Sequence, residues 1–287
     1  MEIPLLKPVI DYVFIYIFTH KSNEKALISL LHAILQIDIK SIVVGPQKLP
    51  REGPFLKSAT LDVVATLHDG TIINVEMQMV FYKEYIDRIL YYWAKHFTFQ
   101  PIIGQGHGSL NKTISITIFD TGSRFFPHAH SRYKLMECSC DPKHALTDKA
   151  EFHFIDLSRI EEMKNITVNK SLILWMKFFR SRTREEMKAL AEQDACIGLA
   201  FKTLETMSLD KNEVYQAWAR EKFWMDQQIR EEREEAERKR EREEGEKKGR
   251  EEGKKEGIIQ TAKAMIVKGI DIETVCEITG LSPEDFT

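Results

Sequence analysis

The chain has 287 residues, of which 43% are hydrophobic and 30% are charged, and its formal net charge is −3. The hydrophobic content excludes an intrinsically disordered chain, and the length allows one large domain or two small ones. The balanced charge names no partner, although residues 221–287 contain 14 basic and 19 acidic residues. We therefore expect one globular body followed by an acidic tail.

The start of the chain lacks a basic segment followed by an apolar core. Elsewhere no apolar run approaches the roughly 18 residues that a membrane span requires. These two observations predict a cytoplasmic protein without a membrane partner.

The N-terminal half alternates between helical and strand patterns. Apolar residues recur at helical spacing in residues 7–37, which predicts two helices or one interrupted helix. Residues 39–45 predict a short strand, residues 46–58 a loop rich in Pro and Gly, and residues 61–78 a β-hairpin. Residues 80–100 carry aromatic side chains at helical spacing, and this stripe predicts a helix that packs against the core.

Strand patterns continue in the middle of the chain and then give way to helices. Residues 112–120 and residues 151–160 alternate as strands, and residues 124–147 predict a loop with some strand. Residues 170–225 have a helical pattern throughout. Sheet elements followed by helices predict an α/β (α+β) sandwich with a helical C-terminal half.

The C-terminal part begins with a charged run, residues 228–257, that contains almost no apolar residue. Glycine recurs there every four residues, from Gly245 to Gly257, and glycine is unfavourable in helices. We expect a solvated, frayed helical linker, and a helix that pairs closely along its glycine stripe is the alternative.

The tail that follows is punctuated as three short helices and resembles a helix-turn-helix. Its last segment carries Glu284 and Asp285, where a DNA-reading helix would carry basic or amide side chains. We therefore favour docking or self-association of copies through these helices over DNA reading. The predicted division is a body of residues 1–225, a linker of residues 226–257 and a tail of residues 258–287.

The hairpin "LDVVATLHDGTIINVEMQ" carries acidic residues at its open end. A two-residue Asp-Gly loop would place Asp62 and Glu76 on opposite surfaces. A three-residue loop, with Gly70 in the left-handed conformation, would instead place Asp62 opposite Glu76, with Gln78 on the same surface. The second register also gathers the apolar side chains on the other surface, so we predict it.

Two carboxylates opposed across a strand pair lie about 5 Å apart at Cβ and repel each other. A hard cation such as Mg²⁺ would compensate them, because it takes oxygen ligands from one or two carboxylates and keeps positions for water and phosphate. Such an ion polarises a phosphodiester and activates water, so the hairpin predicts metal-assisted hydrolysis of a nucleic-acid backbone. The alternative is a hairpin with one wet face and solvated acids, which is the more common case for this spacing alone.

The hairpin resembles the Asp, then Glu-x-Gln or Glu-x-Lys, pattern of the PD-(D/E)xK nuclease superfamily. More specifically, it is similar to the Rpn group of bacterial recombination-promoting nucleases, also called transposases. The stretches "DYVFIYIF", "DRILYYWAKHF", "FHFIDL", "LILWMKFF" and "GIDIETVCEITGLSPEDF" extend this resemblance in order over nearly the whole chain. The resemblance implies a restriction-endonuclease-like mixed sheet flanked by helices. It also implies a Mg²⁺- or Mn²⁺-dependent DNA endonuclease that supports recombination or transposition of mobile elements.

By this resemblance Asp62 and Glu76 would hold the metal, and Gln78 would stand where many relatives have Lys. A Lys brings positive charge to the scissile phosphate, whereas Gln can only orient groups by hydrogen bonds, which implies slower or absent catalysis. Asp11 or Glu24 would add a third carboxylate, as acids of the first helical region do in some relatives. Their alternative role is that of acids favoured by the dipole at a helix start.

Basic residues after the hairpin are candidate contacts to the DNA backbone. They are Lys83, Arg88 and Lys95, and an ordinary solvated polar face is their alternative. The chain departs from the group at Ile15, where many relatives have Lys, so a phosphate contact from the first helix is lost. A catalytically degenerate member that acts by DNA binding or protein association is therefore the alternative function.

Overall fold

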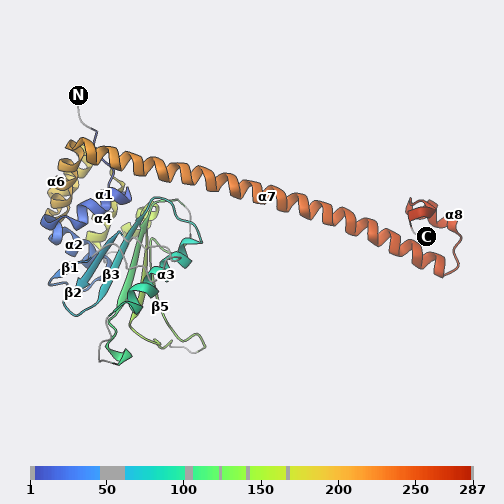
Figure 1. Ribbon diagram of the computed structural model, residues 1–287, viewed down its shortest axis with the longest axis horizontal. Helices are drawn as coiled ribbons and strands as arrows, with labels where there is room; N and C mark the ends of the chain where they lie inside the picture. Colours follow the sequence, from blue (N-terminus) through green and yellow to red (C-terminus); the bar gives the residue numbers. More distant parts are fainter. Residues whose placement is uncertain are drawn as a thin grey trace. The chain divides into compact units, whose positions relative to one another are not determined.

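The computed structural model describes residues 4–45, 62–100, 106–122, 125–139, 143–165 and 169–285 (Figure 1). The chain divides into two compact units, Met1–Met225 and Asp226–Thr287. The functional division into a nuclease-like body, a linker and a tail stays a prediction. In the described part of the chain, no helix is both long and apolar enough to cross a membrane.

The first unit is built on a six-stranded sheet of order β1-β2-β3-β4-β6-β5. Its strands are β1 (Ile42–Val44), β2 (Val63–Leu67), β3 (Ile72–Gln78), β4 (Thr113–Phe119), β5 (His130–Lys134) and β6 (Ala150–Asp156). Strands β1 to β3 pair antiparallel, β3, β4 and β6 pair parallel, and the edge strand β5 pairs antiparallel with β6. The mixed sheet confirms the predicted α/β class.

The helices of the first unit lie largely in the segments where the sequence pattern predicts them. They are α1 (Asp11–Thr19), η1 (Lys21–Asn23), α2 (Glu24–Leu35), α3 (Tyr85–Thr98), η2 (His107–Ser109), η3 (Leu157–Asn165), α4 (Lys170–Arg180), α5 (Arg184–Gln193), α6 (Ala195–Leu209) and the start of α7 (Lys211–Val267). Two predicted boundaries are wrong: α3 begins five residues after the start of its aromatic pattern, and β6 ends at Asp156. The Asp156 carboxylate accepts a hydrogen bond from the Ser158 N–H at 3.0 Å, which turns the chain into η3.

The two faces of the sheet pack against different helices (Figure 1). One face, with Val63 and Val75 among its members, joins α1, α2, α4, α5 and α6 in the large core. The other face packs against α3 and the residues just before it, through Phe81, Ile89 and Phe154. Phe81 stacks on Phe119 with ring centroids 4.7 Å apart, so it belongs to the core although it precedes the helix.

The second unit contains the rest of α7, then α8 (Ile272–Thr279) and the short η4 (Pro283–Asp285). The charged run is helical, but α7 continues through its glycines, so the prediction of a separate first tail helix is wrong. The predicted caps of α8 are confirmed: Asp271 accepts from the Thr274 N–H at 3.0 Å, and Gly280 closes the helix at φ 69°.

Candidate functional site

The hairpin formed by β2 and β3 has the register predicted from its polar and apolar pattern. Val64 pairs with Asn74, and the Gly70 N–H closes the turn by donating to the Leu67 carbonyl at 3.0 Å. Gly70 has a φ of 84°, the left-handed conformation that this three-residue turn requires. Because side chains alternate along a strand, Asn74, Glu76 and Gln78 lie on one face of the sheet. This is the face that α3 covers.

Asp62 lies directly before β2, and its carboxylate meets the backbone of β3. The Met77 N–H donates to Asp62 Oδ2 at 2.8 Å. The described pairing of β2 with β3 begins one position further on, with Val63 opposite Val75. The Asp62 carboxylate oxygen therefore accepts a hydrogen bond from β3 that a backbone carbonyl would accept in a longer strand pair. Burial and the neighbouring charge of Glu76 raise the pKa of Asp62 well above its ordinary value, against the lowering effect of the Met77 bond.

Glu76 lies within β3 and is 2% exposed. Its two oxygens accept from its neighbours on the same face, Asn74 Nδ2 to Oε1 at 3.0 Å and Gln78 Nε2 to Oε2 at 3.0 Å. Burial raises the pKa of Glu76, although the charge of Arg88 and the two amides lower it. The wet-face interpretation of the hairpin is therefore wrong, because Asp62 and Glu76 are both buried.

Helix α3 brings Arg88 to the face that carries these carboxylates. The Arg88 guanidinium lies 5.2 Å from the ring centroids of both Tyr85 and Tyr92. Its charge partly opposes the rise that burial causes in the pKa of Glu76 and of Asp62, so it acts on both acids. The structure thus groups Asp62, Glu76, Gln78 and Arg88, four of the residues that the sequence singled out.

The two predicted additional acids have different surroundings. Asp11 on α1 is buried, and its Oδ2 accepts from Arg220 Nε at 2.7 Å and from Trp224 Nε1 at 2.9 Å, both on α7 within the first unit. Its charge raises the pKa of Asp62, which places it within electrostatic range. Glu24 is exposed at the first position of α2, where the helix dipole favours an acid. The structure therefore brings Asp11, and not Glu24, to the acid pair.

The two lysines predicted to contact DNA also differ. Lys83 is exposed in the segment before α3, and its role stays a prediction. Lys95 is 7% exposed in the last turn of α3, with Nζ 4.9 Å from the Tyr91 ring centroid. The Lys95 Nζ has no hydrogen-bond partner among the described residues, and its role as a DNA contact stays a prediction.

Two further oxygens beside the acids are not among the site atoms predicted from the sequence. Asn74 Oδ1 and Thr117 Oγ1 are buried and have no hydrogen-bond partner among the described residues. Thr117 on β4 is the direct strand partner of Glu76, and Asn74 precedes Glu76 on the same face. The alternating "TISITIF" of β4 carries the signal for this polar strand face, since Thr113, Ser115 and Thr117 share one side.

The donor set of this face is made of oxygens, which is the chemistry that Mg²⁺ and Mn²⁺ prefer. Within the described ranges, no group of three or more His, Cys, Asp or Glu side chains is placed to hold a metal. Two carboxylates suffice for Mg²⁺, because this ion usually keeps several waters and binds substrate phosphates with the rest of its coordination sphere. The partnerless oxygens of Asn74 and Thr117 beside two acids of raised pKa therefore fit a hard dication.

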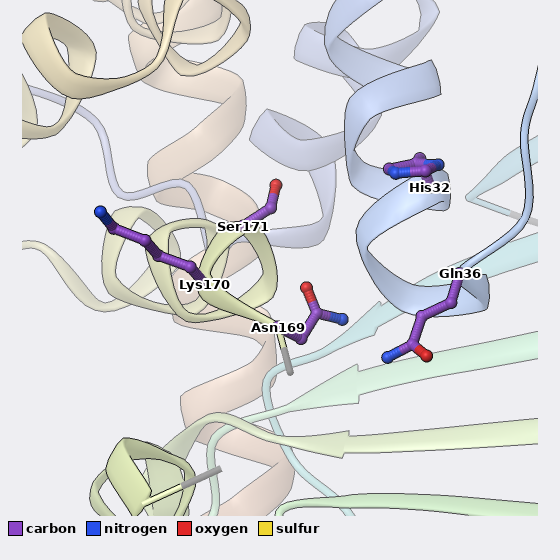
Figure 2. A pocket seen from close by; sticks show the side chains of 5 residues that line it. All are labelled: His32, Gln36, Asn169, Lys170 and Ser171. Atoms are coloured by element: carbon purple, nitrogen blue, oxygen red, sulfur yellow. The ribbon is translucent and has the colours of Figure 1, made fainter. Parts of the chain in front are cut away.

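A separate surface hollow lies where the end of α2 meets the start of α4 (Figure 2). It is lined by His32, Gln36, Asn169, Lys170 and Ser171. Asn169 accepts from the Leu172 N–H at 3.0 Å and so caps α4. The lining contains none of the predicted site residues, and we assign it no chemistry.

The mixed sheet flanked by helices and its acidic hairpin define an α/β protein of the restriction-endonuclease-like class. A family model described as "PD-(D/E)XK nuclease family transposase" matches residues 8–234, and the chain belongs to this family. A second model, described as "Rpn/YhgA-like nuclease family, C-terminal HTH domain", matches residues 255–287. Searches of curated proteins and of solved structures gave no match.

These matches confirm the resemblance to the Rpn group and indicate a nuclease-type protein. The helix-turn-helix description of the tail also favours DNA as a partner, which weakens our preference for a docking module. Association of copies through the C-terminal helices stays a prediction.

Proposed function

We propose that this protein is a Mg²⁺- or Mn²⁺-dependent DNA endonuclease in which Asp62 and Glu76 hold the metal. The observation that carries the proposal is the burial of both carboxylates on one face of the hairpin, with the pKa of each raised. Burying like charges side by side is costly unless a cation compensates them. The nuclease-type family supports the same assignment.

The surroundings of the two acids orient them before a ligand arrives. The Met77 N–H holds Asp62, and the amides of Asn74 and Gln78 hold Glu76 from both sides. Preset ligands reduce the ordering that binding requires. When bound, the dication supplies Lewis acidity to the phosphodiester and to the attacking water.

Gln78 has an orienting role in this site. Its amide donates to Glu76 Oε2 and carries no charge that could stabilise the phosphate. In the hydrolysis, water adds its oxygen to phosphorus, the bond to one nucleotide oxygen breaks, and that leaving oxygen takes a proton. Asp11, held by Arg220 and Trp224, adds negative charge beside Asp62 and so strengthens the attraction for a cation.

A plasmid-nicking assay with and without EDTA tests the proposal on the wild type, Asp62→Asn and Glu76→Gln. We expect nicking only without EDTA, and a loss of about 10³-fold or more in each variant, because an uncharged amide binds the dication much more weakly than a carboxylate. Glu192→Gln, which changes an exposed acid of α5 in the same way, is the matched control. Undiminished nicking by folded Asp62→Asn and Glu76→Gln would refute the assignment.

The second candidate function is a catalytically degenerate member that acts by DNA binding or protein association. The neutral Gln78, in the position where many relatives carry Lys, favours it. Calorimetric titration with Mn²⁺ separates the two candidates, because a degenerate member without metal ligands shows no saturable site. A saturable site that Glu76→Gln removes supports the enzyme.

The cellular role that we propose is DNA cleavage in the cytoplasm that supports recombination or the movement of mobile elements. The family description as transposases and the helix-turn-helix match of residues 255–287 support it. In this role the tail binds DNA, so removal of residues 255–287 should lower an affinity that depends on salt. An affinity that does not change would assign the tail to another role.

A further inference from the structure

The proposed site has no positive charge at Gln78, because this side chain is a neutral amide. This side chain is 4% exposed, and its amide is committed to Glu76 Oε2. Hydrolysis of a phosphodiester builds negative charge on the phosphoryl oxygens, and a cation of the protein commonly stabilises that charge. A neutral amide that already bonds to a carboxylate cannot provide it.

Arg88 is a cation near the two acids of this site. Its Nε is buried and has no hydrogen-bond partner among the described residues. Helix α3 covers the sheet face that carries Glu76. The charge of Arg88 opposes the burial that raises the pKa of Glu76 and of Asp62, so Arg88 is within electrostatic range of both acids. No ion pair joins Arg88 to either acid within the described ranges, although ion pairs do hold other buried acids, such as Asp11 with Arg220. Arg88 therefore lies near the acids with donor capacity that the protein itself does not use.

Neighbours on α3 hold the guanidinium in this place. Tyr85 and Tyr92 are three residues before and four residues after Arg88, so their rings flank it on one helix face, each at 5.2 Å. Two aromatic faces restrain a guanidinium by cation–π attraction without using its N–H donors. The adjacent Ile89 is 2% exposed and anchors the helix in the core of this face.

We propose that Arg88 contacts the scissile phosphate and supplies, from α3, the positive charge that Gln78 does not. This inference rests on the proposed nuclease function and names a contact to a phosphodiester of nucleic acid. The planar guanidinium matches two phosphate oxygens at once, which an amide cannot do. Arg88 keeps its protons throughout: the water oxygen bonds to phosphorus, the leaving oxygen departs with a proton, and the guanidinium stabilises the charge between these events.

The test compares full-length wild type with Arg88→Gln, which removes the charge and keeps a polar chain. We expect the single-turnover cleavage rate at saturating protein to fall about 100-fold. DNA affinity, measured by fluorescence anisotropy in EDTA, should change less than about threefold, as expected for one phosphate contact among several. Lys188→Gln makes the same charge change at an exposed position of α5 and should leave both quantities unchanged. A loss confined to affinity would make Arg88 a backbone contact and overturn the proposal.

A charge-relocation variant sharpens the test. Gln78→Lys combined with Arg88→Gln places a cation at the position that is neutral here. We expect the double variant to cleave at least about tenfold faster than Arg88→Gln alone, since the lost charge is restored near the phosphate. A folded double variant that cleaves no faster would count against an electrostatic role for Arg88.

Metal affinity supplies a readout that does not depend on cleavage. A cation near the acids repels a dication, so Arg88→Gln should bind Mn²⁺ several-fold more tightly than the wild type in calorimetry. Equal affinities would show that Arg88 does not act on the acid pair. If the wild type and Glu76→Gln behave alike in cleavage and Mn²⁺ binding, the proposed function itself fails. If they differ but Arg88→Gln matches the wild type, only the inference on Arg88 fails.

Discussion

One buried acid, Glu151, and one buried pair of acids, Asp62 and Glu76, lie at the same sheet in opposite electrostatic surroundings. We call each, with its neighbours, a group. Glu151 on β6 is 2% exposed, and it accepts from His153 Nε2 at 2.9 Å and from Arg132, while Lys112 Nζ lies 2.5 Å from its Oε2. Burial acts to raise the pKa of Glu151, but these donors hold it well below its ordinary value. Cations of the protein itself therefore compensate the charge of this acid.

Asp62 and Glu76 are buried too, but the pKa of each of these acids is raised. The described donors to these two acids include the Met77 N–H and the side-chain amides of Asn74 and Gln78, all of them neutral. Glu76 pairs with Thr117, whereas Glu151 pairs with Ile114, three residues away on β4, so the two groups lie on opposite faces of the sheet. Burial alone therefore does not mark a functional acid. The partners decide whether a buried carboxylate stabilises the fold or attracts a ligand.

The largest effect on stability should come from Glu151→Gln, which leaves Arg132, Lys112 and Lys134 around a neutral side chain. We expect the free energy of unfolding to fall by about 2–3 kcal/mol, because the hydrogen bonds and ion pairs of these cations to a charged carboxylate are lost. Denaturant titration measures it. Glu76→Gln, the same change in the other group, should not lower the stability. Equal losses in the two variants would abolish the distinction between the groups.

Metal addition should stabilise the protein through Asp62 and Glu76 and not through Glu151. At about thirty times its dissociation constant, Mn²⁺ should raise the free energy of unfolding of the wild type by about 2 kcal/mol. The rise should vanish in Glu76→Gln and persist in Arg132→Gln, which changes the Glu151 group. Thermal melts with and without the ion measure it, and a rise retained by Glu76→Gln would place the ion elsewhere.

The register that places Asp62 beside Glu76 depends on the turn at Gly70. Gly70→Ala should cost about 1–2 kcal/mol, because an L side chain is strained at φ 84° and its Cβ would come within 2.7 Å of Asn111 Nδ2. Mn²⁺ affinity should fall with it. Gly106→Ala, at a position with open space and no positive φ, is the control. Unaltered stability and affinity in Gly70→Ala would show that the turn does not set the site.

The smallest effect that we predict concerns pH and the histidines beside Glu151. Burial, together with the charges of His153 and Arg132, lowers the pKa of His130 to about 4, and His130 Nε2 lies 2.8 Å from His153 Nδ1. The unfolded chain then binds more protons than the folded chain between pH 6.5 and 4. Stability is complete above about pH 6.5 and is lost as the pH falls.

His130→Asn, which keeps a side chain able to hydrogen-bond, should remove about 1 kcal/mol of this loss between pH 6.5 and 4. Denaturant titrations at a series of pH values measure it. Asp62 and Glu76 act in the opposite direction, because a raised pKa favours the folded state as the pH falls. Because His130→Asn leaves Asp62 and Glu76 unchanged, the difference between the wild type and this variant in the same buffers gives the contribution of His130 alone. If the free energy of unfolding depends on pH identically in the two proteins, His130 makes no such contribution.

The hairpin could be read from the sequence because its geometry is local. The alternation of polar and apolar residues chooses one register, and the turn residue Gly70 permits it. The order of strands and helices follows from similar local patterns. The end of β6 could not be read, because the alternation runs past Asp156, and only the hydrogen bond from Ser158 shows where the strand stops.

The surroundings of the site could not be read in the same way. Sequence spacing assigns Arg88 and Lys95 equally to a polar helix face, but packing places Arg88 between two tyrosines near the acids and buries Lys95. Asp11 likewise meets Arg220 from more than 200 positions along the chain. Such contacts depend on how distant segments pack.

The order of the elements, the register of the hairpin and the shared surface of Asp62 and Glu76 thus follow from local sequence patterns. The burial of these acids, the action of Arg88 and Asp11 on them and the compensation of Glu151 follow only from the packing of the folded chain. The two sets differ in the range of the forces involved. Strand alternation and turn geometry depend on near neighbours in the chain, whereas desolvation and electrostatic interactions depend on every atom that folding brings close.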